Sequence, residues 1–349
     1  MGDGTGTSGA RPPLVFHFTG NDIPAWGLVT LKNSPQRWPG QVFLLHDRDQ
    51  PPQIEGVSSV DVRDWYDPQP FQEFSARFER PSQFRNGFWF HAVERFFVLD
   101  QWSEEFETAR FLHTELDVVL MWCDQLSTTL AKLPRGIFYP RASQMNAGAN
   151  FLFVNGAQAL RPLLDFFIQN SGEEYEMGLL ARFLDERETN ALALPSHFNF
   201  EDDFPVNPGG AGVTLQRMGG VIDVHPIGTW IFGQDPRNKP TGAIFNHYYY
   251  HNIGTSELSA LTYRAARPSG ELLVHREIGA EWPVFALHVH SKVMKRAHNP
   301  YALGLYAWLS NRNWKTMIVA QNLTQYPRAI ARKGMNFIYR NLILRLLNR

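Results

Sequence analysis

Residues 14–20 have the sequence LVFHFTG, a mainly apolar run that ends in a glycine turn. A similar run, QVFLLHD, occupies residues 41–47, and VSSVDVRDW at residues 57–65 is a third candidate strand. Short apolar runs bounded by turn residues are typical of buried strands. Between the first two runs, residues 24–40 (PAWGLVTLKNSPQRWPG) predict a short helix that ends before the Ser34–Pro35 pair. Alternating strands and helices predict an α/β fold around a mainly parallel sheet.

The elements further along the chain continue this alternation. HAVERFFVLDQW (91–102) and EEYEMGLLARFLDE (173–186) predict helices, and residues 136–156 predict a strand, a polar loop and another strand. Ligands bind beyond the carboxyl ends of the strands in such sheets. We therefore expect the chemistry in the turn after residues 14–18 and around residues 115–117. The partition we expect is a flexible tail (1–13), one catalytic domain (14–300) and a basic amphipathic C-terminal helical extension (301–349).

The composition is that of an ordinary globular protein. The chain has 349 residues, of which 44% are hydrophobic and 19% are charged, so the composition favours neither intrinsic disorder nor a long helical rod. The single cysteine, Cys123, cannot form an internal disulfide, and its apolar neighbours predict a buried structural thiol. No P-loop, zinc-ligand spacing or serine–histidine nucleophile pattern is evident.

The most informative motif is FLHTELDVVLMW at residues 111–122, in which Glu115 and Asp117 flank one apolar residue. At the end of a strand, alternation would place both carboxylates on the same face. Two carboxylates directed at one point suit Mg²⁺ or Mn²⁺, which keeps open positions for phosphate oxygens. A bridging metal of this kind neutralises the charge that develops on a leaving diphosphate.

The run resembles the DXD motif of nucleotide-sugar glycosyltransferases with the GT-A fold, with Glu115 in place of the first Asp. The resemblance implies a GT-A-like (Rossmann-like) α/β fold with a mixed, mainly parallel sheet flanked by helices. It also implies Mn²⁺ or Mg²⁺ as the cofactor, a nucleoside-diphosphate sugar as the donor substrate, and a glycan or lipid-linked acceptor. Because Glu is one methylene longer than Asp, direct coordination is expected more of Asp117 than of Glu115.

The resemblance extends to residues outside the motif, which either carry positive charge or could bind metal. Arg95, on the helix before the motif, matches an Arg that points toward the donor phosphates; its alternative is a salt bridge with Glu94 or Asp100. In FALHVHSK (285–292), His288 and His290 share a face of a strand, and either could be a further metal ligand. Lys292 matches a Lys that contacts the diphosphate.

The remaining expectations concern the donor pocket and the acceptor. Thr19 and Gly20 match the start of the nucleotide-base pocket, and amides downstream of the motif match the strand that lines the sugar pocket: Asn146, Asn150 and Asn155. Glu176 and Asp235 are the candidate catalytic acids. If transfer inverts the anomeric configuration, one of them deprotonates the acceptor; if transfer retains it, Glu176 positions the sugar. Glu176 could equally be a helix N-terminal acid favoured by the dipole.

The charges are distributed unevenly along the chain. Residues 282–349 contain 11 Lys and Arg and no acidic residue, whereas the first 281 residues contain 22 basic and 34 acidic residues. A basic amphipathic C-terminal helix predicts either contact with an anionic membrane surface or packing on the catalytic domain. The single cysteine, the lack of an apolar signal-peptide core after the N-terminal residues and the lack of a long apolar stretch predict a cytoplasmic protein, and the basic C-terminus suggests peripheral contact at the inner membrane face. The alternative functions are a metal-dependent phosphohydrolase or nucleotidyltransferase, and a non-catalytic sugar-nucleotide-binding module; no nucleic-acid-binding module is recognisable.

Overall fold

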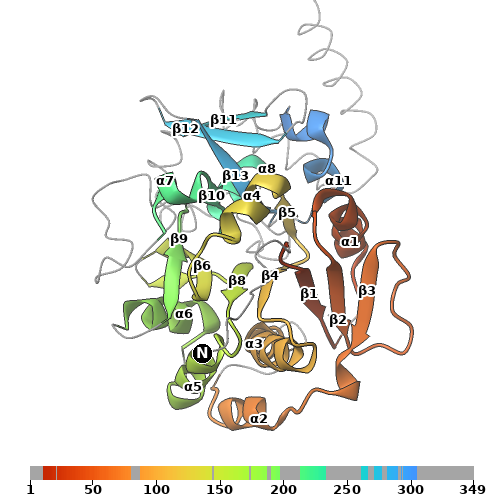
Figure 1. Cartoon of the computed structure of the whole chain (residues 1–349), viewed down its shortest axis with the longest axis vertical. Coiled ribbons are helices and arrows are strands. Elements are labelled where there is room, and N and C mark those ends of the chain that lie inside the picture. Colours follow the sequence, from red (N-terminus) through yellow and green to blue (C-terminus); the bar gives the residue numbers. More distant parts are fainter. Residues whose placement is uncertain are drawn as a thin grey trace, which may run out of the picture.

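The structure of the chain is a computed structural model. It describes residues 11–20, 22–79, 87–143, 145–172, 174–186, 190–196, 213–232, 261–265, 271–276, 281–289, 292 and 294–304. Within these residues the predicted α/β class is confirmed: a mixed, largely parallel sheet is flanked by helices (Figure 1). The expected C-terminal helical extension lies outside the described residues from residue 305 onward.

The main sheet has the strand order β3-β2-β1-β4-β8-β6-β7, and β9 pairs with β6. The strands β3, β2, β1 and β4 are mutually parallel, and β8 then runs antiparallel to β4 and to β6. The strands of this sheet are β1 (Leu14–Phe18), β2 (Val42–His46), β3 (Val57–Asp61), β4 (Arg110–Thr114), β6 (Gly136–Ser143), β7 (Asn146–Ala147), β8 (Phe151–Asn155) and β9 (Ala191–Leu194). The three N-terminal strands predicted from the sequence are all present.

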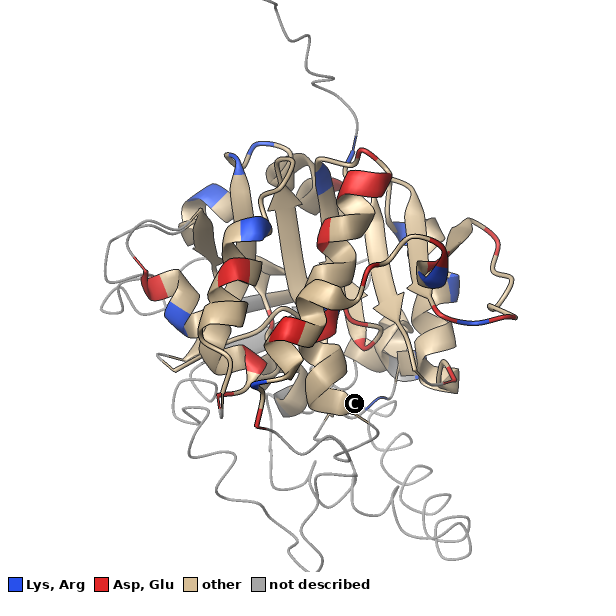
Figure 2. Ribbon diagram, turned by 90° about the horizontal axis from the view of Figure 1, so that it is seen from below, with Lys and Arg blue, Asp and Glu red and all other residues tan. Residues whose placement is uncertain are grey.

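Helices bury both faces of the main sheet. Along β1, Val15 packs into the core on one side, whereas Leu14 and Phe16 pack into the core on the other. The first core includes residues of α2, α3, α5 and α6, and the second includes residues of α1 and α4. Figure 2, which views the molecule from the α2 and α5 side, shows charged positions on helices and loops and few on the strands behind them. The helices that cover the sheet are α1 (Ala25–Arg37), α2 (Gln69–Ser75), α3 (Phe88–Glu105), α4 (Cys123–Leu130), α5 (Arg161–Gln169) and α6 (Glu176–Asp185), with a short 3-10 helix η1 (Val62–Asp64).

A second, smaller sheet begins directly after the sequence motif. Its strand order is β10-β13-β12-β11, and β5 pairs with β13 in the antiparallel direction. Because β5 follows β4 after only three residues, the Glu115–Asp117 segment lies where the two sheets meet. The elements of this part are β5 (Val118–Leu120), α7 (Leu215–Met218), β10 (Val221–Ile222), α8 (Pro226–Phe232), β11 (Leu261–Ala265), β12 (Leu272–Arg276), β13 (Glu281–His288) and α11 (Met294–Ala297).

The helix α1 is longer than its sequence predicts. It continues through Ser34 and Pro35 to Arg37, so the predicted end before the Ser34–Pro35 pair is wrong. Ser34 donates its hydroxyl hydrogen bond to the Thr30 carbonyl at 2.8 Å, and Leu31 is completely buried in the core. Burial of this face stabilises the last turn enough to outweigh the hydrogen bond that a proline cannot donate.

The beginning of the fold lies slightly earlier than the expected boundary at residue 14. The Pro13 carbonyl accepts a hydrogen bond from the Leu112 amide at 2.9 Å, and the Pro12 carbonyl accepts one from the Trp38 indole at 2.9 Å. Residues 12 and 13 are therefore part of the folded unit. Cys123 is buried as predicted, and burial raises the pKa of its thiol to about 12. Among the described helices, none combines the length and the apolar character that a membrane crossing requires.

The length of α1 is testable through its buried face. We expect Leu31→Ala to lower the free energy of unfolding by about 2–5 kcal/mol, because it leaves a cavity between α1 and the sheet. Lys32→Ala, on the exposed face of the same turn, should change it by no more than about 0.5 kcal/mol. Urea unfolding of the two variants measures the difference, and equal effects would contradict the packing described for α1.

Candidate active site

The two carboxylates of the motif lie in a tight turn and not on a continuing strand. The strand β4 ends at Thr114, and the Val118 amide closes the turn by donating to the Glu115 carbonyl at 3.1 Å. The strand alternation expected for Glu115 and Asp117 is therefore wrong, although both side chains do converge. The reason is the residue between them: Leu116 is buried beside Gly27 of α1, and its carbonyl accepts a hydrogen bond from Thr30. Anchoring of Leu116 on α1 leaves its two acidic neighbours free to project elsewhere.

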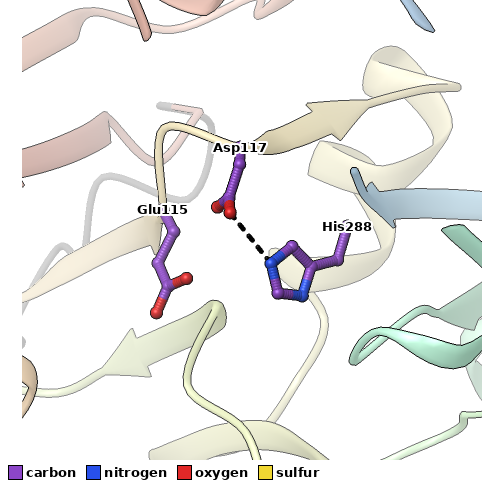
Figure 3. A group of neighbouring side chains, drawn as sticks. All are labelled: Glu115, Asp117 and His288. Carbon is purple, nitrogen blue, oxygen red and sulfur yellow. Dashed lines mark hydrogen bonds and ion pairs between the residues drawn. The ribbon is translucent and has the colours of Figure 1, made fainter. Parts of the chain in front are cut away.

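The strand β13 brings His288 to the same place. In the antiparallel pairing of β5 with β13, His288 lies opposite Val118, and the Val289 amide donates to the Asp117 carbonyl at 2.8 Å. The His288 Nε2 atom lies 3.0 Å from Asp117 Oδ2 (Figure 3). One potential ligand atom from each of Glu115, Asp117 and His288 lies within 4.8 Å of the others. The pairing thus assembles a three-residue cluster from two distant parts of the chain.

The chemistry of these donors fits a divalent cation. The other ring nitrogen of His288, Nδ1, hydrogen-bonds the Val224 carbonyl, which can only accept, so Nδ1 carries a proton. Nε2 faces Asp117, so a metal that takes the place of a proton on Nε2 would meet its lone pair beside the two carboxylates, as in many metal-binding histidines. Carboxylate oxygens suit Mg²⁺ and Mn²⁺, and an added imidazole is compatible with Mn²⁺.

Arg95 joins two of the predicted site residues. Its guanidinium forms ion pairs with Glu115 and with Glu176, the first residue of α6. These contacts replace the alternative salt bridges expected from sequence, since Asp100 pairs with Arg161 and Glu94 contacts His91. Arg95 and Glu176 are both buried, whereas the Glu115 side chain remains 34% exposed. Arg95 therefore holds Glu115 from the protein side while Glu115 stays accessible at the site.

The two carboxylates that share Arg95 differ in electrostatic environment. Burial tends to raise the pKa of Glu115, but Arg95 and then His288 outweigh it and lower that pKa to about 2. Burial raises the pKa of Glu176 above its ordinary value, against the opposing effect of Arg95. Burial disfavours the charged form of Arg95, yet Glu176 and Glu115 hold its pKa above the ordinary value. The opposite directions arise because Glu115 faces further positive groups and Glu176 does not.

Lys292 adds a second cation to the site, and this one lies beside Asp117. Its backbone is left-handed (φ 61°), which is uncommon for a residue other than glycine, and its amide donates to the Val289 carbonyl at 2.8 Å. This turn directs the ammonium group back to Asp117, with which it forms an ion pair. The same ammonium lies 5.1 Å from the centre of the Trp26 ring, in cation–π range. A cation is thus already attracted to the Asp117 carboxylate.

Thr19 and Gly20 lie at the same edge of the sheet. They follow β1, and the Gly20 amide donates to Asp47 Oδ2 at 2.8 Å, just after β2. Gly20 has a φ of 79°, and a Cβ there would lie 2.9 Å from the His91 ring, so only glycine fits. His91 is one helical turn before Arg95 on α3, so this turn lies beside the predicted donor site.

Two of the three asparagines predicted for the sugar pocket, Asn150 and Asn155, have different positions. The Asn150 carbonyl accepts a hydrogen bond from the Glu115 amide at 3.1 Å, so this residue does adjoin the site. Asn155 does not: it pairs with Arg110, at the opposite end of β4 from Glu115. Its amide nitrogen donates to the Leu133 and Pro134 carbonyls, and its oxygen accepts from Arg110. The expectation for Asn155 is therefore corrected to a structural role, because the antiparallel direction of β8 carries it away.

Two further predicted residues, Asp235 and His290, lie outside the described residues. Asn146, which the sequence also suggested, accepts a hydrogen bond from the Tyr175 hydroxyl on the residue before α6. Of the remaining site predictions, the structure gathers five side chains around one point at the carboxyl edge of β4: Arg95, Glu115, Asp117, Glu176 and His288, with Lys292 beside Asp117.

Sequence reasoning missed residues that support this cluster. In the sequence, Leu116 is only the apolar residue between two carboxylates, although it anchors the turn, and Asp223 belongs to no motif. Asp223 is completely buried, and burial raises its pKa to about 6, against the lowering effect of the Gly228 amide and His288. Asp223 lies three residues before Pro226, the first residue of α8, and a proline at this position marks a helix start in the sequence. The contact of Asp223 with His288, however, is not visible in the sequence.

Comparisons with known proteins add a likeness of fold. No protein-family model matches the sequence, and no curated protein matches it. Three solved structures that resemble the chain are glycosyltransferases. PaToxG shares 15% identity (46% of this chain, 61% of PaToxG, TM-score 0.32). The galactosyltransferase LgtC, in complex with donor and acceptor sugar analogues, shares 11% (54% and 77%, TM-score 0.35). GlyE of Streptococcus pneumoniae TIGR4 shares 15% (89% and 63%, TM-score 0.40).

The chain spans about three fifths of the length of PaToxG and of GlyE. At such TM-scores the likeness is loose, and the roles of individual residues rest on the geometry of this chain alone.

The buried ion pairs of Arg95 provide a test of the site's construction. We expect Arg95→Met to lower the free energy of unfolding by about 3–5 kcal/mol, because it leaves Glu176 and Glu115 without their partner. Arg63→Met removes an arginine that also binds two carboxylates, Asp49 and Asp61, but at the surface, and should have little effect. Urea unfolding compares the two variants. A loss for Arg95→Met no larger than that for Arg63→Met would argue against a buried cluster.

Proposed function

We propose that this chain is a metal-dependent glycosyltransferase. It takes a sugar from a nucleoside-diphosphate sugar, with UDP or GDP as the leaving group, and transfers it to a hydroxyl of a glycan or lipid-linked acceptor. The observation that carries the proposal is the convergence of Glu115, Asp117 and His288 at the carboxyl edge of the parallel strands. Open α/β sheets bind their ligands at this edge.

The balance of charge at the site supports a diphosphate as the ligand. Glu115, Asp117 and Glu176 supply three carboxylates, and Arg95 and Lys292 supply two permanent cations. These five groups together carry a net charge of about -1, which disfavours a diphosphate. A bound divalent cation reverses the sign of the net charge. The site therefore binds a nucleoside diphosphate well only when the metal is present.

The protein groups act where charge develops. When bound, the metal neutralises the leaving diphosphate; Asp117, Glu115 and His288 would hold it. Lys292, on a turn beside Asp117 and Trp26, can exchange its contact with Asp117 for one with a phosphate oxygen. Arg95 presents Glu115 to the site and is itself held by Glu176. Thr19 and Gly20 form the turn beside which the nucleotide would lie, and Asn150 would lie beside the sugar.

The position of Glu176 favours a positioning role. It is buried, and its carboxylate is hydrogen-bonded to Arg95. Burial leaves little of Glu176 accessible to an acceptor hydroxyl, and its ion pair with Arg95 stabilises the charged form of both groups. We therefore assign Glu176 to the support of Arg95 and leave Asp235 as the candidate base for an inverting transfer.

Metal and nucleotide binding test the proposal directly. We expect Mn²⁺ to raise the melting temperature, and Mn²⁺ with either UDP or GDP to raise it further, whereas the nucleotide without metal has little effect. A ligand at a hundredfold excess over its dissociation constant adds about 2.7 kcal/mol of stability. Asp117→Asn should abolish both increases, and Asp49→Asn, a carboxylate whose side chain is 88% exposed, should not. No increase with any nucleoside diphosphate would contradict the proposed function.

Replacing Lys292 should change the affinity for Mn²⁺ and the affinity for nucleoside diphosphate in opposite directions. Lys292→Met should tighten the binding of Mn²⁺ alone by roughly tenfold, because the variant lacks a cation that competes for Asp117. The same variant should weaken the binding of nucleoside diphosphate in the presence of Mn²⁺ by a similar factor, because a contact with phosphate is lost. Isothermal titration calorimetry measures both affinities. Lys295→Met, an exposed lysine on α11, is the control, and weaker binding of both ligands to Lys292→Met would contradict the exchange.

A further inference from the structure

The Asp223 side chain is a hub of hydrogen bonds behind the candidate metal site. It is completely buried between α8 and the end of β13. Its oxygens accept from the Ile227 amide at 2.9 Å, the Gly228 amide at 2.7 Å and the His288 amide at 3.2 Å. The first two bonds cap the start of α8. The third ties the backbone of His288 to this capping interaction.

The next residue, Val224, determines the orientation of the His288 ring. Its carbonyl accepts the hydrogen bond from His288 Nδ1, while His288 Nε2 lies 3.0 Å from Asp117 Oδ2. A carbonyl partner selects the ring form with a proton on Nδ1 and directs Nε2 toward the carboxylates. Asp223 therefore holds the backbone of His288, and the adjoining peptide holds its ring.

The same segment is bonded to the other side of the site through Asn150. The Asn150 amide nitrogen donates to the Asp223 carbonyl at 2.9 Å, and the Asn150 carbonyl accepts from the Glu115 amide at 3.1 Å. A continuous chain of hydrogen bonds thus links Glu115 to His288 by way of Asn150, Asp223 and Val224. These bonds connect two of the three candidate metal-binding residues.

Two glycines show how closely the segment of residues 223–228 is packed. A Cβ on Gly228 would lie 1.9 Å from the His288 carbonyl oxygen. A Cβ on Gly148 would lie 2.5 Å from Val224 Cγ1 and 3.1 Å from the Asn150 side-chain oxygen. The segment therefore cannot shift toward either neighbour without moving His288 or Asn150.

We propose that Asp223 is a positioning residue that sets the affinity of the metal site, because it holds His288 on one side and the Asn150–Glu115 link on the other. The proposal rests on the metal-binding part of the proposed function. Asp223 contacts neither metal nor substrate in this scheme, and its effect is transmitted through His288 and Asn150. A change at Asn150, in the sugar pocket, would therefore alter the metal site through the same hydrogen bonds.

The test is the affinity for Mn²⁺ alone, measured by the electron paramagnetic resonance signal of free Mn²⁺. We expect Asp223→Ala to weaken binding by roughly 10- to 100-fold, as loss of a residue that orients a metal ligand commonly does. Asp223→Asn keeps one acceptor oxygen, so its affinity for Mn²⁺ should lie between those of Asp223→Ala and the wild type. Thr214→Ala also removes a helix cap, at Arg217 in α7, and should leave the affinity unchanged. Unchanged affinity in folded Asp223→Ala would overturn the proposal.

A second pair of variants keeps the proposal testable if Asp223→Ala does not fold. Gly148→Ala should push Val224 aside and weaken Mn²⁺ binding by roughly tenfold. Adding Val224→Ala removes the clashing Cγ1 atom and should restore the affinity. Wild-type affinity in Gly148→Ala, or no recovery in the double variant, would count against the positioning role.

A measurement without metal separates this proposal from the proposed function. In protein labelled with ¹⁵N-histidine, the ring signals that disappear in His288→Gln belong to His288. We expect them to show a proton fixed on Nδ1 in the wild type and exchange between ring forms in Asp223→Ala or Gly148→Ala. If wild-type protein binds no Mn²⁺, the proposed function fails, and these signals still decide whether Asp223 orients His288. The same ring signals in wild type and variants would overturn the positioning role.

Discussion

The antiparallel pairing of β5 with β13 is the constraint on which the candidate site depends. It places His288 opposite Val118, directly after Asp117, although the two segments are far apart in the chain. A shift of one residue in this register would turn the imidazole to the other face of the small sheet. The junction of the two sheets is therefore also the point at which a carboxylate pair becomes a three-residue cluster. Asp223 and Val224 then hold the imidazole in the orientation that this register provides.

The charges around the junction explain why the cluster is stable before any ligand binds. Arg95 is shared by Glu115 and Glu176, and Lys292 pairs with Asp117. Burying carboxylates costs much free energy unless each has a charged or hydrogen-bonding partner. The two cations supply these partners from inside the protein and from the site's rim. This division leaves the exposed side of Glu115 and the Nε2 atom of His288 for a divalent cation, which in turn makes the site attractive to a diphosphate.

Much of the fold could be predicted because the relevant patterns are local. The apolar runs of β1 and β2 and the periodic apolar residues of α3 and α6 mark buried faces directly. The sequence motif likewise led to Glu115, Asp117 and Arg95. The errors occurred where contacts between distant segments outweigh local preference. Packing on the sheet extends α1 past Pro35, burial of Leu116 bends the ELD segment into a turn, and the direction of β8 removes Asn155 from the site.

The amino-acid sequence by itself determined the α/β class, the order of the main elements in the first half of the chain and the residue types that can bind a metal and a phosphate, because periodicity and composition act over a few residues. Only the tertiary structure decided which of those residues meet. The partners of Arg95, the choice of ring nitrogen in His288 and the link from Glu115 through Asn150 to Asp223 all join segments separated by tens of residues or more. Such contacts depend on strand register and close packing, and neither is encoded in any single stretch of the chain.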